Sequence, residues 1–223
     1  MKRFPLVPRA LLLLASLTAC AGDEQLGPLG VEETLDPGET LLDKDCDPLV
    51  PTQCGFPFPS NVWLADDEAT ATKKRVAFGA GTLPKSKSSS TSIDPAQWSD
   101  SDGFSTGQAP MTHLPGATVT GLPTQDSIDL SLSDDSPTVL IEAETGKRVP
   151  HFAELDMSAD TDDDRAFMIR PVVRLKDATR YIVAIRRVVD ADGRRLQPTP
   201  VFKALRDGEW LDSEPSVGRR REL

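Results

Sequence analysis

The sequence predicts a mainly β chain that folds as an antiparallel β-sandwich. After residue 117, short runs rich in β-branched residues recur at a spacing of about ten residues. Turns rich in Gly, Asp and Pro separate these runs, and helical periodicity is weak along the chain. We expect the sandwich domain at residues 46–210, after a signal peptide (1–20) and a disordered acidic tether (21–45), with residues 211–223 beginning a following segment.

A basic start followed by a short apolar run predicts that the first residues are a signal peptide. The apolar run at 10–17 is shorter than the ~20 residues that a membrane-spanning helix needs. It ends in Leu17-Thr18-Ala19-Cys20, which resembles the lipobox of bacterial lipoproteins. That resemblance implies that Cys20 carries acyl chains that anchor the protein in a lipid bilayer. Ala21, which follows, implies the outer membrane; an ordinary secretory signal with an incidental cysteine is the alternative.

The segment after the signal peptide is acidic, rich in Gly and Pro, and has no apolar period. Residues 21–45 are therefore typical of a flexible tether between a membrane and a folded domain. Loss of Lys2, Arg3 and Arg9 with the signal peptide leaves 22 basic and 35 acidic residues, a net charge of −13. This charge argues against a nucleic-acid partner and against electrostatic docking on an anionic bilayer.

Cys46 and Cys54 are the cysteines that remain besides Cys20. In an oxidising compartment, two cysteines so close in sequence predict a disulfide, with two free thiols as the alternative. Closing this short loop would stabilise the fold by about 2.5 kcal/mol on the chain-entropy model. We expect no metal site, because the two histidines, His113 and His151, lie far from both cysteines in the sequence.

The individual elements follow from the apolar runs and the turns between them. Upstream, the sequence offers a flexible polar loop at 84–92 and a single helical turn at 94–100. The last residues, from Pro215 onward, resemble the first turn of a helix that the sequence does not continue. We therefore expect the chain to be truncated relative to a longer parent. The predicted strands are 109–114, 138–143, 146–155, 166–171 and 179–190, with a return strand at 194–198.

Two acidic stretches have some of the character of calcium sites. In the stretch 190–193 the glycine comes fourth, whereas an EF-type loop requires it sixth, so a hairpin turn with positive φ at Gly193 is favoured. The stretch 156–165 is typical of a solvated loop between two strands, with adventitious divalent binding left open. The sequence has no Gly-rich phosphate loop, Cys/His cluster or His-Glu-x-x-His motif, and we expect no cofactor.

Residues 103–107 read Gly-Phe-Ser-Thr-Gly and match the nucleophile elbow of serine esterases. An elbow needs an apolar strand before the serine and a helix after it, whose N-terminus helps to hold an oxyanion. Here polar residues precede Gly103, and Pro110 and Pro115 forbid a helix after it. His113 is too close to Ser105 for the usual hydrolase order, and His151 is expected to be a half-exposed sheet residue. We therefore predict a turn leading into the strand 109–114, with no catalytic residue in this chain.

Three segments together resemble the N-terminal region of bacterial surface lipoproteins related to extracellular lipases and esterases. They are "CDPLVPTQCGFPFPSNVWL", "DPAQWSDSDGFSTGQAPMTHLPG" and "MIRPVVRLKDATRYIVAIRRVVDADGRRL". In that family an Ig-like β-sandwich precedes an α/β-hydrolase domain, which holds the catalytic serine. The resemblance implies an Ig-like fold over roughly residues 46–210 and a hydrolase domain beyond Leu223, so it assigns no catalytic residue here.

Three functions follow as hypotheses. The leading one is a non-catalytic Ig-like module of a lipid-anchored protein of the bacterial envelope, accompanying an acyl-ester hydrolase domain that is missing here. The second is a self-sufficient ligand-binding or adhesion lipoprotein that uses loops at the ends of the sandwich. The third and weakest is an esterase that uses Ser105. The expected partners are a bilayer, through acylated Cys20, and the downstream hydrolase domain.

Overall fold

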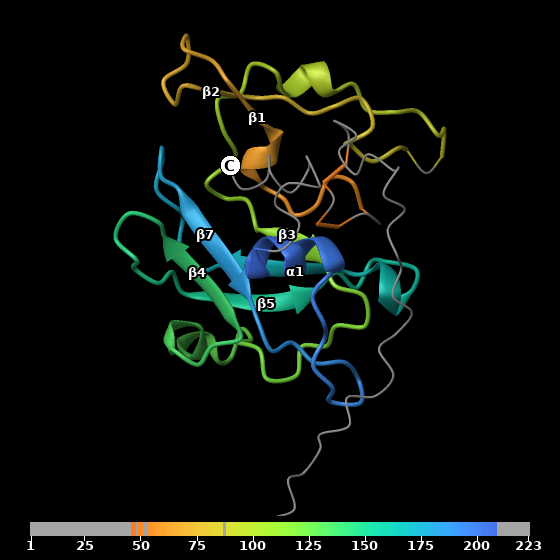
Figure 1. Cartoon of the computed structure of the whole chain (residues 1–223), viewed down its shortest axis with the longest axis vertical. Helices are drawn as coiled ribbons and strands as arrows, with labels where there is room; N and C mark the ends of the chain where they lie inside the picture. The colour runs from red at the N-terminus through yellow and green to blue at the C-terminus, as the bar shows by residue number, and fades with distance from the viewer. Residues whose placement is uncertain (1–45, 48, 51–52, 87, 209–223) are drawn as a thin grey trace, which may run out of the picture. The chain divides into compact units, whose positions relative to one another are not determined.

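A computed structural model describes residues 46–47, 49–50, 53–86 and 88–208 of the chain (Figure 1). The predicted signal peptide with its lipidation site Cys20, the tether and the segment 211–223 lie outside the described residues. Among the residues described, the fold is mainly β, as predicted. The sandwich and its Ig-like topology go beyond what these sheets show and stay predictions.

The strands form antiparallel sheets of two, three and two strands (Figure 1). Strand β1 (Leu64–Asp66) pairs with β2 (Lys74–Val76). Strand β6 (Ala166–Pro171) lies between β3 (Met111–His113) and β5 (His151–Leu155). Strand β4 (Thr138–Glu142) pairs with β7 (Tyr181–Ile185). Between the strands lie the 3-10 helices η1 (Asn61–Trp63), η2 (Pro95–Trp98), η3 (Ile128–Leu132) and η4 (Asp162–Asp164).

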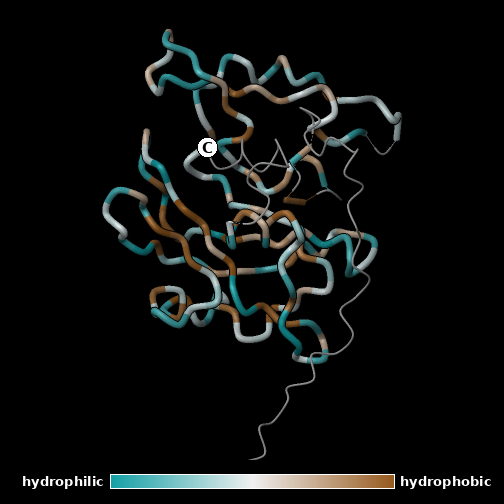
Figure 2. Tube along the Cα trace, viewed as in Figure 1, coloured by the Kyte–Doolittle hydropathy of each residue, from teal (hydrophilic) through white to brown (hydrophobic). Residues whose placement is uncertain are grey.

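The hydrophobic core forms on one face of the three-stranded sheet. In β6 buried residues alternate with less buried ones, so that Phe167 and Ile169 point the same way, as the period of a strand requires. They pack with Ala153 of β5 and with Leu122 and Val188 from loops, and Ile185 of β7 packs against the same cluster. In Figure 2 the hydrophobic stretches are clear along β4 and β7. The core therefore also touches the end of the β4–β7 pair.

Only the second part of the predicted strand 146–155 is a strand, and the first part forms an isolated bridge to β4. The first part runs beside β4, with the N–H of Val149 donating to Leu140 at 2.8 Å and the N–H of Glu142 donating to Lys147 at 2.9 Å. The second part is β5, which pairs with β6. Pro150 lies at the change of partner because it has no N–H to continue either ladder. The single strand expected at 146–155 was wrong for this reason.

The predicted strand 179–190 is also shorter than expected, because β7 ends at Ile185. Arg187 has a φ of 58°, which interrupts an extended strand. The hairpin turn follows as predicted: Gly193 has a φ of 79° and its N–H donates to Asp190 at 3.1 Å. The expected return strand is reduced to one bridge between Val189 and Arg195.

Helix α1 (Pro200–Asp207) is an element that the strand pattern did not predict. Its local signals are nevertheless present: the hydroxyl of Thr199 accepts from the N–H of Phe202, Pro200 occupies the first turn, and Gly208 ends the helix with a φ of 72°. Val201 and Ala204 are its buried residues. The Thr199 hydroxyl also lies 3.4 Å from the carbonyl of Leu49, so the N-cap joins α1 to the start of the described chain.

Candidate ligand-binding site

Five aromatic side chains gather in the part of the chain before the longer strands. Phe78 lies at the centre, with its ring centroid between 6.0 and 6.5 Å from those of the other four rings. Two contacts are close to perpendicular, the edge-to-face geometry that aromatic quadrupoles favour: Phe58 with Phe104 at 5.3 Å and Phe78 with Trp98 at 6.4 Å. The aromatic cluster comprises Phe58, Trp63, Phe78, Trp98 and Phe104.

The aromatic cluster borders a pocket of about 400 Å³, within the size range of small-molecule sites. Trp63 is buried, whereas Trp98 is 37 % exposed. No charged side chain is among the lining residues, and the polar ones are neutral. We call this hollow the aromatic pocket; its lining residues are Phe58, Val76, Phe78, Leu83, Trp98, Ser101, Gly103, Phe104, Ser105 and Gln108.

Backbone hydrogen bonds fix the walls of the aromatic pocket. Phe58 and Met111 exchange two backbone hydrogen bonds, at 2.8 and 2.6 Å, and these bonds hold the lining residue Phe58 against β3. The N–H of Val76 donates to Ser101 at 2.9 Å, which holds the segment after η2 against β2. The guanidinium of Arg75 adds to this by donating to the carbonyl of Ser99. Trp98 is therefore presented from a short helix whose end is held by β2.

The disulfide between Cys46 and Cys54 closes a loop directly before Phe58. This is the pair that the sequence predicts. The N–H of Asp47 donates to Cys54 at 3.1 Å within the same loop, and the N–H of Phe56 donates to Gln53 at 2.8 Å. The loop is thus closed by a backbone hydrogen bond as well as by the disulfide, and it ends four residues before Phe58, the first lining residue of the aromatic pocket.

Ser105 lines the aromatic pocket, but its setting is that of a turn. Its hydroxyl accepts from the N–H of Gly107 at 3.2 Å, and its carbonyl accepts from the N–H of Gln108 at 3.0 Å. Within the described chain the Ser105 hydroxyl has no other hydrogen-bond partner. A nucleophilic serine needs a base within hydrogen-bond reach. The turn that the sequence predicts here is present, followed by β3.

The two histidines are engaged elsewhere. Nε2 of His113 meets the carbonyl of Asp163. In His151 the Nδ1–H donates to the carbonyl of Val149 at 2.8 Å, which leaves Nε2 to accept from the hydroxyl of Thr138 at 2.9 Å. His151 is fully buried, so its expected half-exposed position was wrong. Two satisfied ring nitrogens explain how the ring is buried in neutral form.

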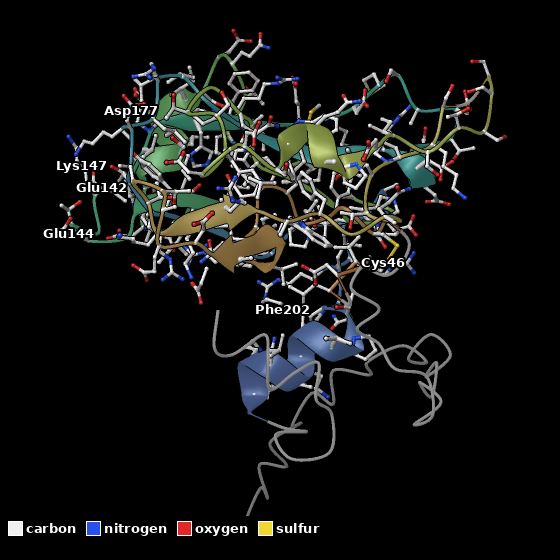
Figure 3. All side chains as sticks on the ribbon, turned by 90° about the horizontal axis from the view of Figure 1, so that it is seen from above. Cys46, Glu142, Glu144, Lys147, Asp177 and Phe202 are labelled. Carbon is white, nitrogen blue, oxygen red and sulfur yellow. A yellow bond between two sulfur atoms is a disulfide. The ribbon has the colours of Figure 1, made fainter. Side chains whose placement is uncertain are left out.

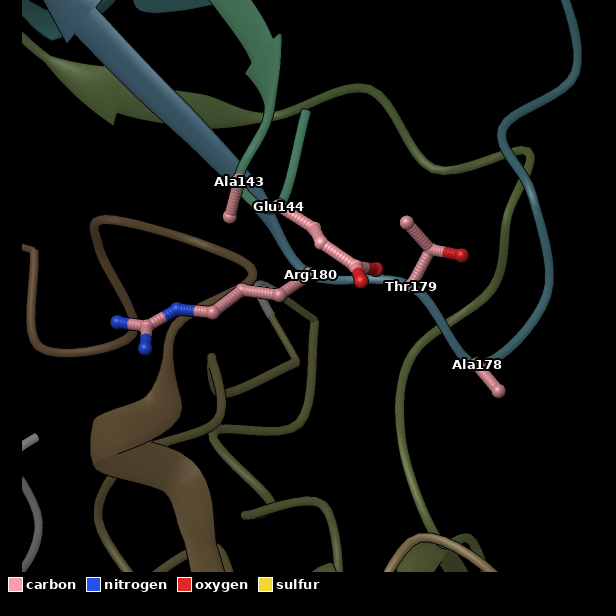
Figure 4. Close-up of a pocket in the computed structure, with 5 residues that line it drawn as sticks. All are labelled: Ala143, Glu144, Ala178, Thr179 and Arg180. Atoms are coloured by element: carbon pink, nitrogen blue, oxygen red, sulfur yellow. The ribbon is translucent and has the colours of Figure 1, made fainter. Parts of the chain in front are cut away.

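A second hollow, of about 330 Å³, lies at the far end of β4 (Figure 4). Ala143 and Glu144 line it together with residues 178–180. In Figure 4 the Glu144 carboxylate points toward Thr179, while the Arg180 guanidinium points away. Figure 3 shows Glu144 in a charged group with Glu142, Lys147 and Asp177, away from Cys46. No aromatic side chain lines this hollow, and its lining includes the charged residues Glu144 and Arg180.

The structure also bears on metals and membranes. No group of three or more His, Cys, Asp or Glu side chains in the described ranges could hold a metal ion. In those same ranges no helix has the length and apolar character needed to cross a membrane. Carboxylates of the loop 156–165 interact with neighbouring residues of the same loop. Asp162, for example, forms an ion pair with Arg165 at 2.7 Å.

The sequence pattern does not reveal the aromatic pocket. The five aromatic residues are separated by 5 to 20 positions and follow no helix or strand period. One signal was available: they all fall between residues 58 and 104, a stretch that otherwise contains many polar residues and turns. Apolar rings in such a stretch must pack on one another, because no long strand or helix nearby can cover them.

Comparisons of the chain with models of known protein families, with curated proteins and with solved structures found no match.

Proposed function

We propose that this chain is a non-catalytic, ligand-binding module of a lipid-anchored protein of the bacterial envelope, and that the ligand occupies the aromatic pocket. The observation that carries the proposal is the lining of that pocket: aromatic rings with a few neutral polar groups at the rim. Small-molecule sites are generally built in this way, with apolar walls for affinity and few polar groups for orientation.

The setting of Ser105 supports binding over hydrolysis. Its hydroxyl is hydrogen bonded to Gly107 in a turn, and both ring nitrogens of His151 are occupied by Thr138 and Val149. A hydroxyl on the rim of an aromatic pocket can orient a ligand without any base beside it. In this proposal the module accompanies an acyl-ester hydrolase domain, as the sequence resemblance implies, and leaves the chemistry to that domain.

Gly103 lines the aromatic pocket and has room for a larger side chain that should narrow the pocket without disturbing the fold. A Cβ at this position meets no atom within 4 Å, and the backbone has no positive φ there. The variant Gly103→Leu should therefore fold and place its side chain in open space at the pocket rim.

Benzyl alcohol, a neutral ring with one hydroxyl, is a suitable probe for ligand-observed NMR. We expect it to bind the full chain with a Kd in the millimolar range, near −4 kcal/mol, and to lose that binding in Gly103→Leu. Hydrolysis of p-nitrophenyl acetate should be equal in the wild type and in Ser105→Ala. Equal benzyl alcohol binding by both forms, or ester hydrolysis lost only in Ser105→Ala, would contradict the proposal.

A further inference from the structure

We infer that the aromatic pocket binds a neutral sugar, with a pyranose ring lying against Trp98 and its hydroxyls bonded to the pocket rim. This inference rests on the proposed function and names the chemical class of its ligand. It follows from three properties of the pocket: the exposed indole, the charge of the lining, and the rim groups that still have hydrogen-bonding capacity.

The exposed indole supplies the first property. Trp98 is 37 % exposed although Phe78 packs against it at a centroid distance of 6.4 Å. The contact with Phe78 is edge-to-face, at 79° between the ring planes. Phe78 therefore helps to hold the Trp98 ring in place while part of that ring stays exposed. A flat, partly apolar ring can cover this surface and remove it from water, as the C–H side of a pyranose does.

The lining of the pocket excludes charged ligands. Its side chains are all neutral, and the chain as a whole carries a net charge of −10. An anion would meet a repulsive field and no cation in the pocket wall. An organic cation would find aromatic rings but no carboxylate in the lining. Asp100 and Asp102 flank the lining residue Ser101 but do not line the pocket themselves, and Asp100 is fully exposed and pairs with Arg75 at 3.8 Å.

The rim of the pocket favours a hydroxyl-rich ligand over a plain acyl chain. The Ser105 hydroxyl accepts from Gly107, so its own proton remains available as a donor. Gln108 uses its amide N–H in a bond of 2.9 Å to the carbonyl of Ala109, so its amide oxygen remains an acceptor. Ser101 adds a second hydroxyl whose side chain has no hydrogen bond to any described residue. A ligand without polar groups would desolvate all three at a cost, whereas sugar hydroxyls can pair with them.

Three positions allow separate tests of ligand stacking on Trp98, of ligand access to the pocket, and of nonspecific binding to an exposed aromatic side chain. Trp98→Ala removes the open ring, and Trp98→Phe keeps a smaller one. Gly103→Leu blocks the pocket without a clash at its Cβ. Phe202→Ala is the matched control, since Phe202 is an exposed aromatic residue, 46 % accessible, on α1 and outside the pocket lining.

Saturation-transfer difference NMR on the full chain in phospholipid nanodiscs tests the inference directly. The sugar probes are neutral disaccharides of glucose, galactose, mannose and N-acetylglucosamine, and the comparison probes are hexanol and tetramethylammonium. We expect at least one disaccharide to bind, with transfer strongest at ring C–H protons. Binding should weaken about tenfold in Trp98→Ala, be lost in Gly103→Leu, and persist in Trp98→Phe and Phe202→Ala.

The outcomes separate this inference from the proposed function. If hexanol or tetramethylammonium binds and is displaced by Gly103→Leu while no disaccharide binds, the sugar class is wrong and the binding function stands. If disaccharides bind equally to the wild type, to Trp98→Ala and to Gly103→Leu, they bind outside the aromatic pocket and the inference is wrong. If no probe binds the wild type, both proposals fall. Should Trp98→Ala fail to fold by circular dichroism, Gly103→Leu alone decides between these outcomes.

Discussion

His151 shows at the scale of one residue how a titratable group can be built into a core. The ring is fully buried, and its two nitrogens connect β5 to Thr138 of β4 and to the carbonyl of Val149. Its backbone N–H donates to the buried hydroxyl of Ser131 in η3 at 3.1 Å. Burial lowers the pKa of His151 below its ordinary value of 6.5, and the positive charge of Arg148 acts in the same direction.

The lowered pKa predicts how stability depends on pH. Below pH 6.5 the unfolded chain takes up a proton at His151 that the folded chain refuses, so acid favours unfolding until the pH falls below the folded pKa. The free energy of unfolding in urea should therefore drop between about pH 7.5 and about pH 5.5. In His151→Gln, which does not titrate, the drop should be smaller than in the wild type. An identical drop in both proteins would show that His151 is not the cause.

At the scale of elements, β7 has one paired and one open edge. The N–H of Arg186 donates to Pro137 at 2.8 Å and the N–H of Ala143 donates to Arg180 at 2.9 Å. Because backbone groups alternate along an antiparallel strand, Ala184 also faces β4, whereas Val183 faces away. Among the described residues, no other strand pairs with the open edge of β7.

This alternation predicts opposite tolerance of proline at neighbouring positions. Ala184→Pro removes the N–H that bonds to Val139 and should cost about 2–3 kcal/mol in the free energy of unfolding. Val183→Pro removes only an outward N–H and should cost about 1 kcal/mol or less. Chemical denaturation of the two variants measures the difference. Equal destabilisation would mean that the outer edge of β7 is also paired in the folded protein.

The elements also show how far sequence reasoning reaches. Strand β6 was predicted to the residue, because a short apolar run containing Phe167 and Ile169 ends at Pro171. The split at Pro150 was missed, since a change of partner depends on which sheet is nearby and leaves no period in the sequence. Helix α1 was missed because it has only eight residues and follows a series of strand-like runs, although Thr199 and Pro200 mark its start.

The candidate site was less predictable than the fold. The pairing of Cys46 with Cys54 depends only on their short separation, and the sequence predicted it. The aromatic pocket depends on contacts between residues up to 46 positions apart, such as Phe58 and Phe104. Such contacts are decided by the tertiary fold, so the five aromatic residues could not be joined into one cluster beforehand. The esterase-like motif drew attention to Ser105, which does line the aromatic pocket. Its hydroxyl is hydrogen bonded in a turn there and has no base beside it.

At the scale of the whole molecule, the proposed anchor makes a prediction that needs no knowledge of the ligand. Cys20 is the acceptor of lipid in the lipobox interpretation, so Cys20→Ser should leave the protein released or retained as an unprocessed precursor. The mature wild type should instead fractionate with membranes and gain the mass of its acyl chains. Mass spectrometry of both fractions checks this. Unchanged membrane fractionation of Cys20→Ser would refute the lipobox interpretation.

The bond between the Thr199 hydroxyl and the Leu49 carbonyl has a mechanical consequence for an anchored protein. It joins the first and last parts of the described chain, so a force that pulls on the two ends acts across this contact. The disulfide at Cys46 and Cys54 keeps the first loop from extending under such a load. Under such a load, the contact between Thr199 and Leu49 would have to break before the two ends of the described chain could separate.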